Sequence, residues 1–138
     1  MNDTQQNRRF TFRLDLHSGV PVYRQIIDQV LGGMAAGTLA AGHQLPTVRQ
    51  VAVDLAINPN TVVRAYRELE IRGVLETQQG TGTFISRRKV KHDQVERERA
   101  LTQLVDEFVS RAGAAGFALE ELLEQLKERA AEGGAKRR

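Results

Sequence analysis

The apolar residues near the start of the chain recur with helical spacing. They fall at i, i+3, i+4, i+7, i+8 and i+11, and are Tyr23, Ile26, Ile27, Val30, Leu31 and Met34. This spacing places them on one face of an amphipathic helix. Gly37 follows the last of them, and glycine is common just past a helix end because it adopts the left-handed conformation without strain. We therefore predict a helix that ends before Gly37.

A second, shorter helix is expected from Thr47 onward. Thr47 and Gln50 have the spacing of a capping box, in which each side chain bonds the other residue's backbone N–H. The apolar face of this helix consists of Val48, Val51, Ala52 and Leu55. The preceding stretch, LAAGHQLP, lacks such a periodicity and is predicted to be a connector.

The stretch INPNTVVRAYRELE combines a turn sequence with a helical pattern. Asn58 is a favourable N-cap, and Pro59 suits the first helical position because its missing N–H would have no partner there. Together they predict a sharp helix start, with a helix that runs to about Arg72 and closes at Gly73. The positions expected to face the core are Val62, Tyr66 and Leu69.

Beyond this helix, VLETQQGTGTFIS predicts a β-hairpin. Residues 74–78 and 83–86 are the expected strands, and the segment between them is rich in Gly and Thr. Three helices followed by a hairpin is the order of a winged helix-turn-helix. We predict a mainly α fold with a small β-hairpin, and a winged helix-turn-helix domain over residues 12–89. The polar stretch MNDTQQNRRFTF before it is expected to be a loosely held tail.

The remaining residues, 90–138, predict a charged connector, two helices and a frayed end, EGGAKRR. Their apolar positions are Leu101, Leu104, Val105 and Phe108 in the first helix, and Leu119, Leu122, Leu123 and Leu126 in the second. One two-helix hairpin cannot bury this much apolar surface alone, which favours pairing of the helices between the subunits of a homodimer. Packing of the hairpin onto its own winged domain is the alternative.

The composition and the charge distribution limit the classes of partner and site that we expect for this chain. Residues 1–89 carry 11 Lys/Arg against 7 Asp/Glu, a balance of +4, whereas residues 90–138 carry 9 against 10, a balance of −1. A basic first part is compatible with a nucleic-acid partner. The chain has no cysteine and its three histidines are far apart, so we expect no metal site and no cofactor. No signal peptide or transmembrane run is evident, which predicts a cytoplasmic protein without membrane contact.

The outer face of the third predicted helix carries the candidate chemistry. Asn60, Val63, Arg64 and Arg67 recur at i, i+3, i+4 and i+7 on that face. Asn pairs well with adenine edges, Arg with guanine edges or phosphates, and a helix with such donors near its N-terminus fits the major groove. A solvated helix face is the plain alternative. The short preceding helix, the tight connection and the following hairpin favour DNA.

Arg49 and the GTGT segment are two further candidates for contact with DNA. Arg49, on the outer face of the second helix, is placed to reach a phosphate or a base. The GTGT segment lacks the pattern of a nucleotide-binding loop, and its glycines, Gly80 and Gly82, suit a wing that lies close to DNA.

No nucleophile–base pair or carboxylate dyad is evident, so we do not expect an enzyme. A winged-helix module that binds a protein partner and not DNA stays open as the rival.

The stretch LPTVRQVAVDLAINPNTVVRAYRELEIRGVLETQQGTGTFIS resembles the DNA-binding domain of GntR-type bacterial transcription regulators. The shared motifs are a Leu-Pro-x-x-Arg segment, a Thr-Val…Tyr-x-x-Leu-Glu helix and a Gly-x-Gly-Thr-Phe wing. PVYRQI, at residues 21–26, matches the family's first helix, and the likeness covers about residues 12–87. The short C-terminal part resembles the YtrA-type subgroup, whose members add about two helices.

This resemblance implies a dimeric, sequence-specific regulator, most often a repressor, that binds a palindromic double-stranded operator, often beside transporter genes. Family contacts match Arg49 in the second helix, Asn58, Asn60 and Thr61 at the start of the third, and Gly80 in the wing. With their neighbours, the predicted DNA-binding set is Thr47, Arg49, Asn58, Asn60, Thr61, Arg64, Arg67, Gly80 and Thr81. Pro59 and Val63 depart from arginine-bearing relatives, so the base preference of those relatives is not carried over. A small-molecule effector and control by protein level alone both stay open.

Overall fold

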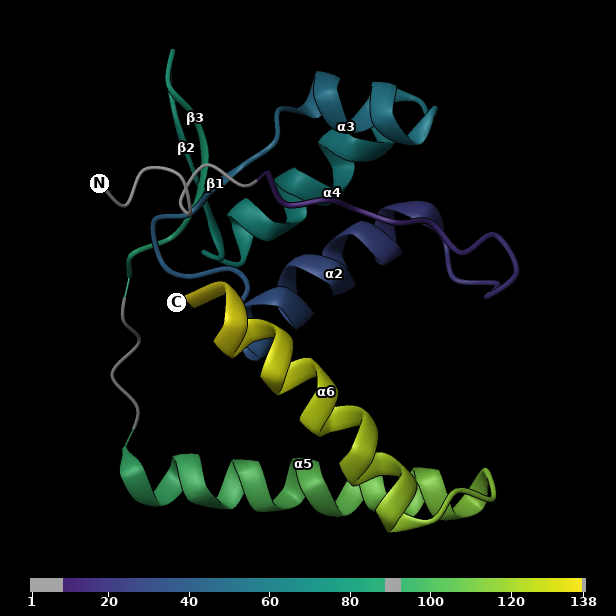
Figure 1. The fold of residues 1–138 in the computed structure, drawn as a ribbon. Helices are drawn as coiled ribbons and strands as arrows, with labels where there is room; N and C mark the ends of the chain where they lie inside the picture. The colour runs from purple at the N-terminus through teal and green to yellow at the C-terminus, as the bar shows by residue number, and fades with distance from the viewer. Residues whose placement is uncertain (1–8, 89–92, 138) are drawn as a thin grey trace. The chain divides into compact units, whose positions relative to one another are not determined.

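The computed structural model describes residues 9–88 and 93–137. The chain divides into two compact units, one that contains the residues up to Arg88 and one from Lys89 to Glu132. The first, hereafter the winged unit, has six elements (Figure 1): α2 (Val22–Ala36), β1 (Gln44–Leu45), α3 (Val48–Leu55), α4 (Pro59–Ile71), β2 (Leu75–Gln78) and β3 (Gly82–Ile85). Two helices follow: α5 (Gln94–Ala114) and α6 (Leu119–Arg137).

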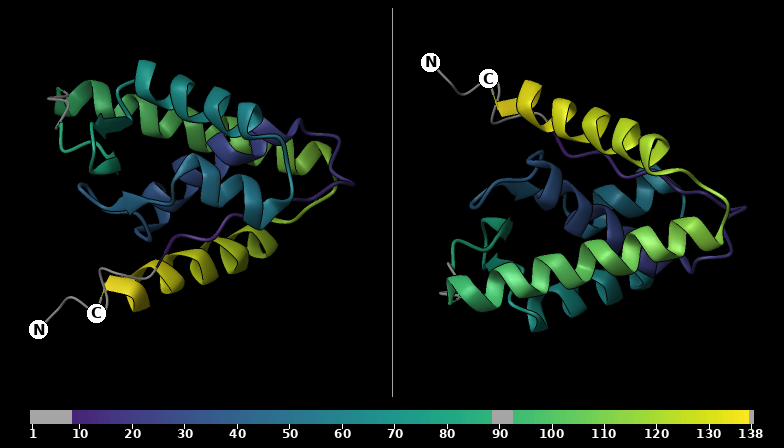
Figure 2. Two further views of the ribbon diagram at one scale, coloured as in Figure 1. Left: turned by 90° about the horizontal axis from the view of Figure 1, so that it is seen from above. Right: turned by 90° about the horizontal axis from the view of Figure 1, so that it is seen from below.

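The core of the winged unit forms around α4, which contacts α2, α3 and β2. Figure 2 shows α2 and α4 from two further directions. The buried residues come from every element of the unit and from the segments before and between them: Phe12, Ile26, Ile27, Val30, Leu39, Leu45, Val51, Ala52, Val62, Ala65, Tyr66, Leu69, Leu75 and Ile85. The predicted inner face of α4 is thus confirmed. It buries its apolar stripe because both neighbouring helices present theirs to it.

The predicted helix ends are confirmed in detail. Gly37 adopts a left-handed conformation, with φ of 85°, at the end of α2. Thr47 and Gln50 form the capping box of α3, with both bonds present. The Asn58 side chain accepts a 2.8 Å hydrogen bond from the backbone N–H of Asn60, and Pro59 occupies the first helical position. Local sequence therefore determines where these helices begin and end.

The sheet has three antiparallel strands in the order β1-β3-β2, so the predicted hairpin gains a third strand. Glu76 pairs with Phe84 across the hairpin, and Gln44 pairs with Phe84 from the other side. The stretch LAAGHQLP was expected to be only a connector, and that expectation is wrong for residues 44–45. Two residues carry no periodicity of their own. They become a strand because β3 offers an unpaired edge.

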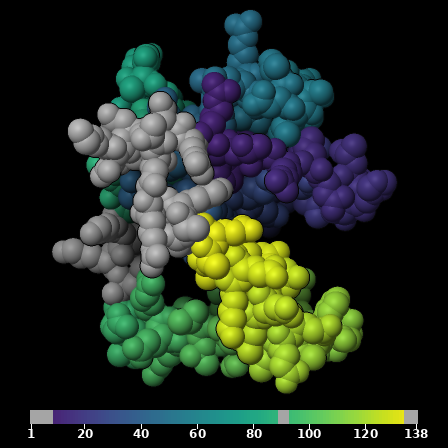
Figure 3. All heavy atoms as spheres, viewed as in Figure 1, coloured from purple at the N-terminus to yellow at the C-terminus, as the bar shows by residue number. Residues whose placement is uncertain are grey.

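The N-terminal segment is part of the core, contrary to the expectation of a loose tail for residues 9–12. Phe12 is only 6% exposed and Phe10 packs against the core, with the two rings edge to face at 5.0 Å. Figure 3 shows this segment, in purple, on the surface of the winged unit. The rest of the expected tail, residues 1–8, lies outside the described residues.

Two glutamines of α2 fasten this segment. Gln29 accepts a 2.8 Å bond from the backbone N–H of Arg13 and donates a 2.7 Å bond to its carbonyl oxygen. Gln25 does the same for Asp15, at 2.8 and 2.9 Å. The glutamines are one helical turn apart and their partners are two residues apart. The two side-chain amides therefore bond the N–H and carbonyl groups of alternate residues, as the backbone of a neighbouring β-strand would.

The C-terminal helices are longer than predicted. Asp93 caps α5, so the helix begins within the expected charged connector; residues 89–92 of that connector lie outside the described residues. The right view of Figure 2 shows the α5 ribbon without interruption. Gly116, with φ of 88°, ends the turn after α5, and α6 continues to Arg137, through the segment expected to fray. Within the described ranges, no helix is both long and apolar enough to cross a membrane.

Candidate nucleic-acid interface

The start of α4 presents polar groups at the surface. Asn58 caps the helix, and the backbone N–H of Thr61 donates a 3.0 Å bond to the Asn58 carbonyl oxygen. Asn60 is exposed and Thr61 is half-buried. The cap consumes the Asn58 side-chain oxygen, whereas the Asn60 amide makes no side-chain hydrogen bond within the described part of the chain. The two asparagines therefore differ: one builds the helix start and the other is available to a ligand.

The outer face of α4 forms a shallow, solvent-open depression. Its lining residues are Asn60, Val63, Arg64, Arg67, Glu68 and Ile71. The four positions predicted to share this face do share it. Val63 and Ile71 add exposed apolar side chains, of the kind that contact thymine methyl groups in a major groove.

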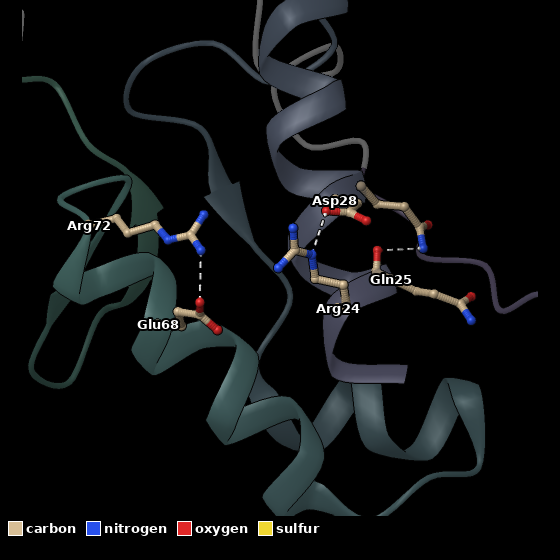
Figure 4. Close-up of polar contacts among 6 residues, drawn as sticks. Arg24, Gln25, Asp28, Glu68 and Arg72 are labelled. Atoms are coloured by element: carbon tan, nitrogen blue, oxygen red, sulfur yellow. Dashed lines mark hydrogen bonds and ion pairs between the residues drawn. The ribbon is translucent and has the colours of Figure 1, made fainter. Parts of the chain in front are cut away.

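The arginines of α2, α3 and α4, with Arg72 at the end of α4, fall into two groups. Arg24 pairs with Asp28 at 3.4 Å and Arg72 pairs with Glu68 at 2.8 Å (Figure 4). The second group is Arg49, Arg64 and Arg67, whose guanidinium groups make no hydrogen bond or ion pair with any residue of the described ranges. All three are exposed. Their donors remain available for phosphates and base edges.

The Arg64 side chain contacts α2. Its guanidinium carbon lies 3.8 Å from the centroid of the Tyr23 ring in α2. Helical spacing groups Arg64 with Asn60 and Arg67, and it gives no sign that Tyr23 belongs to the site. Tyr23 was assigned to the apolar stripe of α2, and its half-buried ring indeed packs against the core. Helical spacing alone contains no information on which side of α4 a long side chain turns.

The second helix of the motif is anchored from α4. The Tyr66 hydroxyl donates a 2.6 Å hydrogen bond to the carbonyl oxygen of Pro46, directly before the N-cap Thr47. Burial raises the pKa of the Tyr66 hydroxyl above its ordinary value. The Thr47 hydroxyl accepts from the Gln50 backbone at 3.1 Å. Arg49, two residues on, is exposed on a helix whose start is held by both contacts.

The wing tip connects β2 and β3 through a tight turn. The backbone N–H of Thr81 donates a 3.0 Å bond to the Gln78 carbonyl oxygen, and Gly80 has φ of 78° with open space around it. Gln44, in β1, donates a 3.1 Å side-chain bond to the Thr81 carbonyl oxygen. At Gly82, a Cβ would lie only 2.5 Å from the Gln44 amide nitrogen. Gln44 was missed in the sequence because its partner is 37 residues away.

Comparison with known proteins identifies this arrangement. The family model for bacterial regulatory proteins of the gntR family matches residues 22–85. The transcriptional repressor YtrA of Bacillus subtilis is 39% identical over 127 residues, which cover 90% of this chain and 97% of that protein. The chain belongs to the GntR family.

Solved structures agree with that assignment. A GntR family regulator from Listeria monocytogenes is 33% identical, with a TM-score of 0.56 over 82% of this chain and 98% of the other. YtrA from Sulfolobus acidocaldarius, a GntR-family transcription factor, is 29% identical, with a TM-score of 0.53 over 75% and 97%. The predicted winged-helix fold and the predicted YtrA-type resemblance are both confirmed. This GntR protein is a DNA-binding transcription regulator, and its relatives are regulators, not enzymes.

The C-terminal helices of the GntR chain carry uncovered apolar faces. Of the eight residues predicted to pair subunits, seven are exposed in the single chain: Leu101, Leu104, Val105, Phe108, Leu119, Leu123 and Leu126. Leu122 is half-buried. Leu104 is 64% exposed and Phe108 is 45% exposed, so neither helix covers the stripe of the other.

Proposed function

We propose that this regulator binds a palindromic operator as a homodimer and represses transcription of the adjacent genes. We call α4 the recognition helix, and two copies of it related by two-fold symmetry fit successive major grooves on one side of the duplex. The repressor assignment follows the name of YtrA, a relative that the chain matches over nearly its whole length. Binding to chromosomal DNA makes it a cytoplasmic protein.

The predicted DNA-binding set supports the operator contact. Asn60 and Arg67 lie along the outer face of α4, and Arg49 projects from α3. The single observation that favours DNA most is that the guanidinium groups of Arg49, Arg64 and Arg67, on α3 and α4, form no ion pair with any described residue, whereas Arg24 and Arg72 do form ion pairs. An exposed cation without a carboxylate partner suits an anionic ligand, and the phosphate backbone supplies one.

The exposed stripe on α5 and α6 supports the homodimer. Exposed apolar patches of this length mark protein contacts in soluble proteins. A second copy of the chain presents the same stripe, and two-fold symmetric pairing buries both at once. In this arrangement, each winged unit binds one half-site of the operator. The pairing of α5 and α6 between two chains relates the two units by the two-fold symmetry that a palindrome requires.

The proposed function includes the genes that the regulator controls and the signal that controls the regulator. Transporter genes beside the operator follow from the family resemblance. A small apolar ligand between the paired helices is one means of control, and the level of the regulator itself is the other. Measuring operator release against metabolite pools distinguishes the two.

Selection of bound sequences from random duplex DNA tests operator binding. We expect a palindromic consensus, with an affinity that falls steeply as the salt concentration rises. Asn60→Ala is expected to relax selection at one base step in each half-site. A uniform loss across sequences would assign Asn60 to a phosphate instead. No enriched sequence and a flat response to salt would reject the operator and favour a protein partner.

Point variants of the full chain test the homodimer. Leu104→Asp places a charge on the apolar stripe, and Gln103→Asp places the same charge beside it on an exposed polar position. Light scattering after gel filtration is expected to give twice the chain mass for the wild type and for Gln103→Asp, and the single-chain mass for Leu104→Asp. Dimers in all three proteins would remove the stripe from the interface.

A further inference from the structure

The stacked pair of Arg64 and Tyr23 joins the recognition helix to the first helix of the winged unit. The guanidinium carbon of Arg64 lies 3.8 Å from the ring centroid, well within the range of a cation–π contact. Tyr23 lies in the first turn of α2, half-buried, and packs against the core. Because α2 and α4 contact each other, the ring is a fixed platform beneath the arginine.

The contact with Tyr23 leaves hydrogen-bonding capacity on Arg64. The guanidinium carbon lies over the ring, and the five N–H donors of the group can still reach other acceptors. No hydrogen bond or ion pair consumes them within residues 9–88 and 93–137. The side chain is therefore both restrained and able to donate.

Glu68 is the acidic residue best placed to compete with the Tyr23 ring for the Arg64 guanidinium group. It lies four residues after Arg64 and lines the same depression, the spacing at which helix surface charges pair. Its carboxylate instead binds Arg72 at 2.8 Å, as the dashed line in Figure 4 shows. Because the Glu68 carboxylate binds Arg72, it does not bind Arg64. The Arg64 guanidinium group contacts the Tyr23 ring instead.

We propose that Tyr23 is a positioning residue for DNA recognition, whose ring holds the Arg64 guanidinium in a preset orientation for a phosphate or base edge. The inference rests on the proposed operator binding. An arginine that is ordered before binding loses less conformational freedom when it contacts DNA. A rotamer-rich side chain that is ordered only on binding weakens affinity by about two- to tenfold.

Fluorescence anisotropy of full-length variants on a labelled operator duplex tests this role of Tyr23. Tyr23→Leu removes the ring and keeps an apolar side chain, whereas Tyr23→Phe keeps the ring and removes the hydroxyl. We expect Tyr23→Leu to bind about two- to tenfold more weakly and Tyr23→Phe to bind as the wild type does. Both changes are repeated in an Arg64→Ala background, where Tyr23→Leu is expected to have no further effect.

Each other outcome has a separate meaning. A loss in Tyr23→Phe equal to that in Tyr23→Leu would assign the effect to the hydroxyl and overturn the inference. An equal loss from Tyr23→Leu with and without Arg64 would overturn it also, because the effect would then bypass the arginine. Absence of wild-type binding would reject the operator itself. Wild-type binding that Arg64→Ala leaves unchanged would overturn the inference while the operator assignment stands.

Discussion

The hydroxyl group of Tyr66 donates a 2.6 Å hydrogen bond to the backbone carbonyl oxygen of Pro46, and both residues are buried. The bond is at the short end of the range for O–H···O contacts. It joins the middle of α4 to the residue before the α3 cap, so it fixes the two helices of the DNA-binding motif relative to one another.

Tyr66→Phe is expected to lower the free energy of unfolding by about 1–2 kcal/mol, because it leaves a buried carbonyl oxygen without its donor. Urea titration at neutral pH measures the change. Tyr23→Phe is the matched control, since the Tyr23 hydroxyl makes no hydrogen bond within the described residues. Equal losses in the two variants would contradict the role of the Pro46 bond.

The same hydroxyl predicts a loss of stability in alkali. Burial raises the pKa of Tyr66, so the folded protein retains a proton that the unfolded chain releases near pH 10. The contribution is fully present below that pH and declines above it, by about 1.4 kcal/mol for each pH unit. Unfolding free energies measured from pH 9 to 11 are expected to fall more steeply in the wild type than in Tyr66→Phe. Parallel curves would rule this out.

Arg49→Ala is expected to weaken operator binding by about 1–3 kcal/mol if the arginine reads a base. Arg97→Ala is the control, because it removes one exposed positive charge from α5, outside the winged unit. Anisotropy titrations at several salt concentrations separate a base contact from a phosphate contact, which reduces the salt slope by about one. Unchanged affinity would remove Arg49 from the DNA-binding set.

Ala56→Gly is expected to stabilise the protein by roughly 0.5–1 kcal/mol, because alanine is strained in the left-handed region and glycine is not. Among the described residues, Ala56 is the non-glycine residue with positive φ, at 53°, in the turn between α3 and α4. Thermal unfolding measures the gain. The matched change Ala35→Gly, inside α2, is expected to destabilise. A loss at both positions would contradict the strain assignment.

Gln44→Met is expected to lower operator affinity by about two- to tenfold with little change in stability, because it frees the wing tip and leaves an exposed side chain of similar size. Duplexes trimmed outside the recognition-helix contacts supply the control, since the wing cannot reach DNA on them. Wild type and variant are expected to bind trimmed duplexes equally. An unchanged affinity for full-length duplexes would show that Gln44 does not order the tip for DNA.

Features determined by neighbouring residues were predictable from the sequence. The caps at Thr47 and Asn58 and the proline start of α4 depend on partners within three residues, and the structure shows them as predicted. The apolar stripes of the helices followed from spacing alone. The position of Arg49 on an exposed helix face needed nothing beyond that spacing.

Features determined by distant partners were not predictable. Strand β1 exists because β3 pairs with it, and Phe12 is buried because α2 holds the segment that contains it. Arg64 turns toward Tyr23, a residue 41 positions earlier in the chain. Periodicity identifies the face on which a side chain begins, and tertiary neighbours decide where a long side chain ends.

The two glutamines of α2 have a consequence for the limits of the domain. The family model matches from residue 22 onward, yet the backbone groups of Arg13 and Asp15 that Gln29 and Gln25 bind, and the Phe12 ring in the core, lie before it. A protein trimmed to start at residue 22 would lose the backbone partners of both amides before that residue and would leave a cavity in place of the Phe12 ring. For this regulator, the folded winged unit therefore extends further toward the N-terminus than the residues that the family model matches.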